Sequence, residues 1–217
     1  MKLLDLFCGA GGCSEGYYRA GFEVVGVDIE PQPNYPFTFI QGDALNPPVD
    51  LQGFDVIHAS RPCQHYSVLT PLDRKNGHPD LIEPVRDMLL DSGVPFVIEN
   101  VPGAKAKLVN PIMLCGTNFG LHTQRHRYFE IHPEFDTLAL VAPCQHYSEP
   151  ILMSGRGMRK SKEGKRYPGS TVAERQWASE IDWMTGDELT QAIPPSYTEW
   201  IGKQLIAMLN RSEVQDG

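Results

Sequence analysis

One cysteine of this chain stands in a setting suited to nucleophilic chemistry. Cys63 follows Pro62 shortly after the apolar run 54–59, which is predicted to be a buried strand. A thiol beyond the end of such a strand lies in a loop at the carboxyl edge of a sheet, where reactive side chains are commonly placed. A lone cysteine is more often a small buried thiol, so the assignment depends on the groups that accompany it.

A carboxylate and two arginines are the groups that could assist Cys63. Glu99 follows the apolar run 95–98, and Arg125 and Arg127 lead into another strand-like stretch. A cation beside a cysteine favours the thiolate, and a buried carboxyl group can share a proton with a substrate. A glutamate at this place can also be a simple strand-end cap.

The amino-terminal third predicts a site for a nucleoside-like cofactor. The apolar run 3–7 leads into the glycine-rich turn 8–12 and then into a predicted helix. Asp28 and Asp43 stand at the ends of the next two predicted strands, so all three turns meet at one edge of a parallel sheet. The glycine spacing differs from Gly-x-Gly-x-x-Gly, and no pyrophosphate cradle is expected.

In their order along the chain, these motifs resemble those of the cytosine-C5 DNA methyltransferases. The motifs that carry the resemblance are Asp5–Gly12, Pro62-Cys63-Gln64, Glu99-Asn100-Val101, Arg125-x-Arg127 and Gln191–Pro195. The resemblance covers most of residues 1–131 and 174–209 and is that of a short, phage- or prophage-like member with a reduced target-recognition region. The chain departs from the family in having Ser60-Arg61 for Gly-Phe, Thr123 for glutamine and Gln191 for asparagine.

The resemblance implies transfer of a methyl group from S-adenosylmethionine to C5 of cytosine in DNA. It implies that Cys63 adds to C6 of a flipped-out base and that Glu99, Arg125 and Arg127 complete the catalytic set. The residues implied for the cofactor are Phe7, Gly9, Ala10, Gly12, Asp28, Ile29, Asp43, Pro62, Gln191 and Ile193. Arg61, Gln64 and Ser67 are expected to contact the nucleic acid.

Charge is distributed unevenly in this acidic chain, whose formal net charge is −8. Six of its 19 basic residues and one of its 27 acidic residues lie between positions 156 and 166, leaving a remainder with a net charge of −13. The basic residues of this segment are Arg156, Arg159, Lys160, Lys162, Lys165 and Arg166. We expect the segment to be disordered when free and to bind the phosphate backbone. A solvated loop is the alternative.

The predicted fold is a Rossmann-like α/β methyltransferase fold, with a mostly parallel mixed sheet, helices on both faces and a small irregular insertion. Residues 1–131 are expected to form the catalytic and cofactor-binding core, 132–173 the reduced recognition insertion, and 174–217 a segment that completes the cofactor pocket. Helices are predicted over 79–90, interrupted by Pro84, and over 197–209.

Composition and short motifs narrow the remaining possibilities. With no membrane-length apolar run and no paired cysteines, the chain is expected to be cytoplasmic, a monomer or weak dimer, and without a membrane partner. No metal is expected, although Cys144 and His146 of a repeated Pro-Cys-Gln-His-Tyr-Ser hexapeptide could contribute to a site. Alternative functions are a tRNA cytosine-C5 methyltransferase, transfer of a modified one-carbon unit, and a non-catalytic binding module.

Overall fold

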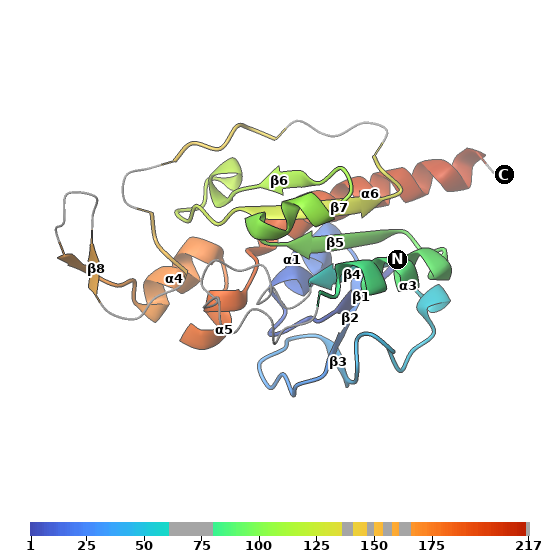
Figure 1. The fold of residues 1–217 in the computed structure, drawn as a ribbon, viewed down its shortest axis with the longest axis horizontal. Coiled ribbons are helices and arrows are strands. Elements are labelled where there is room, and N and C mark those ends of the chain that lie inside the picture. The colour runs from blue at the N-terminus through green and yellow to red at the C-terminus, as the bar shows by residue number, and fades with distance from the viewer. Residues whose placement is uncertain (61–79, 136–140, 147–149, 154–157, 161–165, 216–217) are drawn as a thin grey trace.

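The computed structural model describes residues 1–60, 80–135, 141–146, 150–153, 158–160 and 166–215 (Figure 1). A seven-stranded sheet lies at its centre, in the order β3-β2-β1-β4-β5-β7-β6. Neighbouring strands from β3 to β5 are parallel, whereas β7 is antiparallel to both β5 and β6. The strands are β1 (Lys2–Leu6), β2 (Glu23–Asp28), β3 (Thr38–Gln41), β4 (Val56–Ser60), β5 (Phe96–Asn100), β6 (Ile112–Leu114) and β7 (Arg127–His132).

The strand order reverses its direction of growth between β1 and β4. The chain builds β1, β2 and β3 outward in one direction and then returns to place β4 on the other side of β1. In open α/β sheets, ligands commonly bind beyond the carboxyl ends of the strands at such a reversal. Because β1 and β4 are parallel neighbours, the turn after β1 begins beside the carboxyl end of β4.

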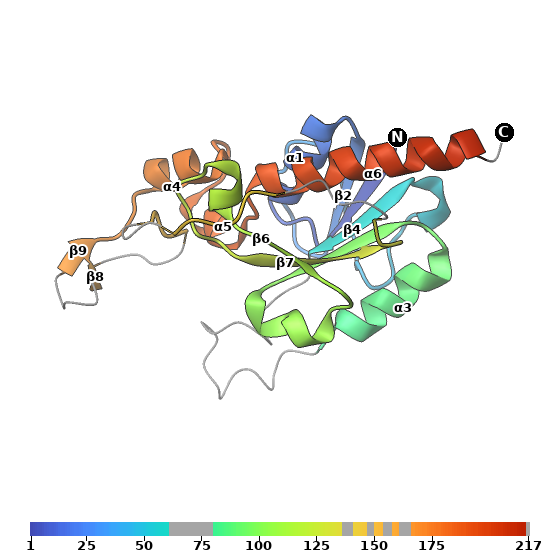
Figure 2. The ribbon, with the colours of Figure 1, turned by 90° about the horizontal axis from the view of Figure 1, so that it is seen from above.

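Helices cover both faces of the sheet, as Figure 2 shows. Helices α1 (Gly12–Ala20) and α6 (Pro195–Gln215) lie on one face, and α3 (Ile82–Ser92) lies on the other. Tyr17 and Tyr197 are fully buried on the first side, and Leu89 of α3 is fully buried on the other. The central strands read as continuous apolar runs because they are covered on both faces. The predicted Rossmann-like α/β fold is confirmed.

Two helices differ from the sequence prediction. Pro84 does not interrupt α3, because the helix begins at Ile82 and the proline falls in its first turn, where a backbone N–H has no intrahelical partner. Helix α6 begins at Pro195 and continues to Gln215, beyond the predicted range. Its apolar side packs along α1, which supports a helix longer than its own amphipathic pattern indicates.

Several short elements were not predicted. They are β6, the 3-10 turns η1 (Leu51–Gly53), η2 (Pro102–Lys107) and η3 (Gly116–Phe119), and the helices α4 (Val172–Ser179) and α5 (Gly186–Gln191). Capping boxes begin both α4 and α5, with Thr171 and Thr185 accepting hydrogen bonds from the glutamates' backbone N–H three residues on. Among the described residues, no helix combines the length and apolar character needed to cross a membrane.

A small hairpin follows β7 in the region predicted to be irregular. Strand β8 (Met158–Lys160) pairs antiparallel with β9 (Arg166–Pro168), and Arg159 is opposite Tyr167. In Figure 1 the hairpin stands away from the main sheet, beyond α4. The backbone at Arg159, Lys160 and Arg166 of the basic segment is therefore part of this hairpin.

Candidate active site

The turn after β1 is shaped around the carboxylate of Asp28, at the end of β2. One oxygen of Asp28 accepts a hydrogen bond from Gly9 N at 3.0 Å, and the other accepts one from Glu30 N at 3.0 Å. The turn also requires positive φ angles, 58° at Phe7 and 49° at Gly9. Glycine adopts such an angle without a steric penalty at Gly9, whereas Phe7 adopts it as a bulky residue, which is uncommon.

Exposed groups beside this turn fit a nucleoside-like cofactor. Ile29 directly follows Asp28, and 63% of its surface is exposed. Asp43 is also exposed, and its Oδ1 accepts a hydrogen bond from Leu45 N at 2.9 Å. No atom of the described residues would lie within 4 Å of a Cβ added to Gly9, so its backbone is open on that side. The carboxylates, apolar surface and open glycine suit the ribose, the adenine and the methionine part of S-adenosylmethionine.

A buried polar cluster beneath the turn was not recognised as such in the sequence. Ser14 donates a hydrogen bond to Asp5 and shares another, 2.8 Å long, with the hydroxyl of Tyr35. Burial raises the pKa of Asp5 to about 7, and the nearby carboxylates of Asp28 and Glu99 act in the same direction. The signal in the sequence was an acid in the middle of an apolar strand, which requires a buried partner.

The carboxyl-terminal segment closes over the same turn. A Cβ on Gly12 would lie 2.5 Å from the carbonyl oxygen of Ile193, so the two backbones touch and only glycine fits. Trp183, whose role was not predicted, donates a hydrogen bond from its indole nitrogen to the carbonyl of Ala10 at 2.9 Å. Ile193 is buried at this contact, whereas Gln191 ends α5 with an exposed side chain. The structure thus brings Ile193 to the predicted pocket.

Glu99 lies at the carboxyl end of β5 and has two polar partners. Its Oε2 accepts a hydrogen bond from Ser60 Oγ at 2.5 Å, and its Oε1 forms an ion pair with Arg127 Nε at 3.0 Å. The side chain is only 3% exposed. Ser60 pairs with Glu99 in the β4–β5 register, and Cys63 follows three residues later in the sequence.

The two predicted arginines lie near each other but contact different groups. Arg127 meets Glu99 and also donates to the carbonyl of His126 at 2.8 Å, whereas Arg125 donates to the carbonyl of Thr190 at 2.7 Å. Arg125 therefore connects the start of β7 with α5, next to the segment that covers the glycine turn. Arg127 thus forms an ion pair with Glu99, and Arg125 donates a hydrogen bond to the last turn of α5.

Two of the other cysteines are unsuited to nucleophilic attack. Burial raises the pKa of the Cys8 and Cys13 thiols well above neutral, and the nearby carboxylate of Asp5 adds to the effect. Both remain protonated at neutral pH, and the thiol is a far weaker nucleophile than the thiolate. The predicted site residues Arg61, Pro62, Cys63, Gln64, Ser67, Arg156, Lys162 and Lys165 lie outside the described residues.

A second group of side chains was only half recognised in the sequence, where Cys144 and His146 were named as possible contributors to a metal site and Cys115 and His126 were missed. Cys115 and His126 come together with Cys144 and His146, although no metal was expected. Cys115 and His126 lie on separate segments without a recognisable spacing motif, so only the fold reveals the set.

The sheet order, the glycine turn at its switch point and the flanking helices define a class I methyltransferase fold. The full-length likeness to solved structures agrees. A prophage-encoded E. coli protein described as a DNA modification methyltransferase is 17% identical to this chain, with a TM-score of 0.64. The structural alignment covers 97% of this chain and 99% of that one. Entamoeba histolytica methyltransferase EhMeth is 15% identical, with a TM-score of 0.62, and its alignment covers 96% of this chain and 98% of that one.

Sequence comparison identifies the family. The model of the C-5 cytosine-specific DNA methylases matches residues 1–114, more than half of the chain, and the chain belongs to that family. Type II methyltransferase M1.HphI of Haemophilus parahaemolyticus is 33% identical over 89 residues, which cover 34% of this chain. The chain spans only about a quarter of that relative's length, 24%.

Proposed function

We propose that the protein methylates C5 of cytosine in DNA, using S-adenosylmethionine and a covalent bond between Cys63 and C6 of the base. The observation that carries the proposal is the environment of Glu99. In a chain of this family, the buried carboxyl group meets Ser60 and Arg127 at the sheet edge where the glycine turn lies. Ser60, the last residue of β4, pairs with Glu99 of β5, and the proposed nucleophile Cys63 follows Ser60 by three residues in the sequence.

The cofactor would be held by the turn after β1 and by the two strands beside it. Asp28 would accept hydrogen bonds from the ribose, Ile29 would cover the adenine and Asp43 would accept a hydrogen bond from its amino group. Phe7, Gly9, Ala10, Gly12, Pro62, Gln191 and Ile193 complete the proposed pocket. When bound, S-adenosylmethionine supplies an electrophilic methyl group.

The side chains at the edge of the sheet would prepare the base for reaction. Addition of the Cys63 thiolate to C6 places electron density on C5, which is otherwise a poor nucleophile. Glu99 would hold the ring nitrogen and exocyclic amine of the cytosine, and Arg127 would fix the orientation of Glu99. Loss of the C5 proton and elimination of Cys63 then restore the aromatic ring. Arg125 and the residues Arg61, Gln64 and Ser67 are proposed to contact the base or its strand.

Residues 132–173 are proposed to be the reduced target-recognition region, between the core 1–131 and the closing segment 174–217. The base must leave the helix to be reached from both faces, at a cost of a few kcal/mol. The basic residues Arg156, Arg159, Lys160, Lys162, Lys165 and Arg166 are proposed to hold the backbone during that step.

Mass analysis of reaction products tests the proposed function. The purified protein is incubated with S-adenosylmethionine carrying a deuterated methyl group and with DNA or RNA of matched base order, and the nucleosides are then separated and weighed. We expect labelled 5-methyl-2′-deoxycytidine from DNA. Label found only in RNA cytidine would show that the substrate is RNA and not DNA. Label on another base or on no base would contradict the proposal.

A further inference from the structure

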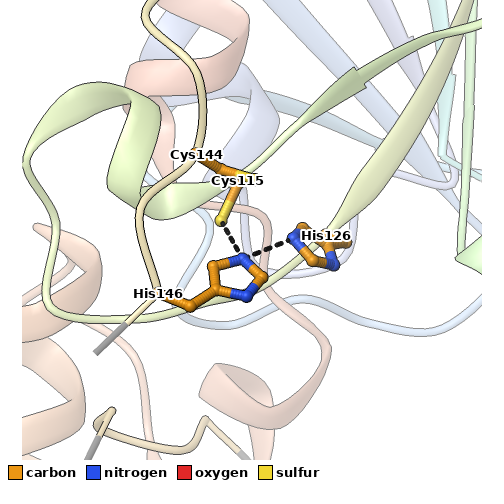
Figure 3. Close-up of side chains that lie close together, drawn as sticks. All are labelled: Cys115, His126, Cys144 and His146. Carbon is orange, nitrogen blue, oxygen red and sulfur yellow. Dashed lines mark hydrogen bonds between the residues drawn. The ribbon is translucent and has the colours of Figure 1, made fainter. Parts of the chain in front are cut away.

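Four side chains with metal-binding atoms converge on one point outside the proposed active site. The sulfur atoms of Cys115 and Cys144 and the ring nitrogens of His126 and His146 all lie within 4.8 Å of one another. His146 Nε2 is 3.0 Å from His126 Nε2 and 3.7 Å from Cys115 Sγ. Figure 3 shows these two contacts as dashed lines that meet at one ring nitrogen of His146.

Three separate segments of the chain supply these groups. Cys115 follows β6 and caps η3, and His126 immediately precedes β7. Cys144 and His146 belong to the segment 141–146, within the second copy of the repeated hexapeptide. Cys115 is buried, His126 and Cys144 are half-buried, and His146 is exposed. The cluster therefore lies at the surface, where the segment 141–146 meets the core.

The geometry agrees with tetrahedral zinc coordination. Bonds of about 2.0 Å to nitrogen and 2.3 Å to sulfur place neighbouring ligand atoms of a tetrahedron roughly 3.3–3.8 Å apart. The separations of His146 Nε2 from His126 and Cys115 are close to this range before any ion draws the groups together. A hydrogen bond between the two imidazoles would explain one of the contacts, but it would not explain two thiols at the same point.

Hydrogen bonds around the cluster hold the segment in a position to coordinate. Asn118 donates from its amide to the carbonyl of Ala142, and Gln145 N donates to Thr117 Oγ1 at 3.1 Å. Thr117 Oγ1 is also 3.2 Å from the sulfur of Cys115. Such contacts outside the coordinating atoms orient ligands in known metal sites.

The segment has little hydrophobic contact to hold it in place. Val141 is half-buried, and Ala142, Pro143 and Gln145 are exposed. A short segment with so little buried apolar surface gains little from packing, and a bound metal is one of the usual ways to fix such a segment.

We propose that Cys115, His126, Cys144 and His146 bind one zinc ion, which fastens the segment 141–146 to the core. Two thiolates and two imidazoles are a ligand set that favours zinc over magnesium or calcium. Protein atoms fill all four positions, so the site is structural and has no open position for a substrate. The two copies of the hexapeptide then have different tasks, since Cys63 of the first copy is the proposed nucleophile and Cys144 of the second is a metal ligand.

Zinc analysis of the full chain tests the site. The protein, freed of any affinity tag and purified from zinc-supplemented cells, should contain about one zinc ion per chain. The variants Cys144→Ser and His146→Ala should lose most of it. The matched control is Cys63→Ser with His65→Ala, which changes the same Cys-Gln-His tripeptide in the other copy and should keep the full zinc content.

Cobalt substitution identifies the ligands without relying on activity. Co²⁺ added to the zinc-free protein should give an absorption band from sulfur-to-metal charge transfer, reduced by about half in Cys144→Ser because one of two thiolates is lost. Chelation should lower the melting temperature of the unaltered protein and leave that of His146→Ala unchanged. No zinc and no charge-transfer band in the unaltered protein would overturn the proposal. Zinc retained by a Cys144→Ser, His146→Ala double variant would also overturn it.

Discussion

Glu99 and Glu130 are buried carboxylates on adjacent strands, each paired with an arginine, yet they belong to different parts of the molecule. Glu130 holds Arg86 of α3 through two contacts of 2.7 Å and also accepts a hydrogen bond from Val109 N. Glu99 pairs with Phe129 in the β5–β7 register, so it and Glu130 point to opposite faces of the sheet. The Glu130 pair supports the helix α3, and the Glu99 pair lies at the carboxyl ends of the strands, where we propose that the base binds.

Replacing each glutamate with glutamine should separate these tasks. Glu99→Gln should lower kcat by about 10²-fold or more, because a carboxyl group at the base is lost while the side-chain volume is kept. The affinity for S-adenosylmethionine should not change. Glu130→Gln is the matched control and should lower the melting temperature without a selective loss of kcat. Equal kcat values for Glu99→Gln and the unaltered enzyme would remove Glu99 from the reaction.

Asp5 gives the molecule a pH-dependent stability of predictable sign. Burial raises the pKa of Asp5 to about 7 from 3.8, so the folded state holds the proton more tightly than the unfolded chain. The stabilisation is complete below pH 3.8 and is lost as pH rises toward 7. From pH 4 to 7, the unfolding free energy should fall relative to that of Asp5→Asn by on the order of 4 kcal/mol.

Denaturant unfolding at several pH values measures this difference. Asp91→Asn, which changes an exposed side chain on α3, should follow the unaltered protein. Parallel curves for the unaltered protein and Asp5→Asn across this range would show that Asp5 is not protonated in the fold.

Helices α1 and α6 approach so closely that glycines are required between them. A Cβ at Gly16 would lie 2.1 Å from the carbonyl oxygen of Pro195 and equally near the hydroxyl of Thr198. Thr198 also donates a hydrogen bond to the carbonyl of Cys13, so a shift of α6 would disturb both the helix contact and the segment over the glycine turn.

Gly16→Ala should therefore destabilise the protein by about 1–3 kcal/mol, because a backbone atom must move to admit the methyl group. For a chain of this size, that corresponds to a fall in melting temperature of roughly 2–4 °C per kcal/mol. Gly53→Ala is the control, since a Cβ added there would have no atom of the described residues within 4 Å. Calorimetry that gave both variants the same melting temperature would contradict this packing.

The strands that the sequence predicts well are those buried on both faces. Strands β1, β4 and β5 are largely apolar runs that end in polar or glycine-rich turns, and these features do not depend on distant residues. Strand β6 has three residues and exists because β7 pairs with it. Its signal is non-local, as is the contact with α1 that favours the longer α6.

At the scale of the whole molecule, part of the candidate site was predictable because motif and fold agree there. The turn after β1, Asp28 and Glu99 fall at strand ends, where the sequence pattern alone puts them. That Ile193 lies at the predicted cofactor pocket was expected only through the family resemblance, and its backbone contact with Gly12 was not predicted. The convergence of Cys115 and His126 with the second hexapeptide depends on the tertiary fold and has no local signal.

Charge is also a property of the whole molecule, and it should govern how DNA binds. A body with net charge −13 repels phosphate, so the six cations of residues 156–166 are the concentrated source of attraction. If four of them contact phosphates, the logarithm of affinity should fall against the logarithm of salt concentration with a slope of about −3.6. Replacing Arg159, Lys160, Lys162 and Lys165 with alanine should flatten this slope.

Fluorescence anisotropy over a range of salt concentrations measures the slope. The double variant Lys2→Ala, Lys203→Ala is the control. Lys2 begins β1 and so lies at the amino-terminal ends of the parallel strands, away from the proposed site, and Lys203 forms an ion pair with Glu199 on α6. S-adenosylmethionine affinity should be the same in all three proteins. An unchanged slope in the quadruple variant would place the binding surface elsewhere, with Arg61, Lys105 and Lys107 the next candidates.

The central claim, cytosine-C5 methylation through Cys63, is tested most directly by covalent trapping. Fluorine at C5 cannot leave as a proton does, so DNA containing 5-fluorocytosine should remain bonded to the enzyme after methyl transfer. We predict an adduct that requires S-adenosylmethionine, maps to Cys63 by peptide mass spectrometry and is absent from Cys63→Ala. An adduct on Cys144, an adduct that persists in Cys63→Ala, or no adduct on DNA that the enzyme methylates would contradict the account.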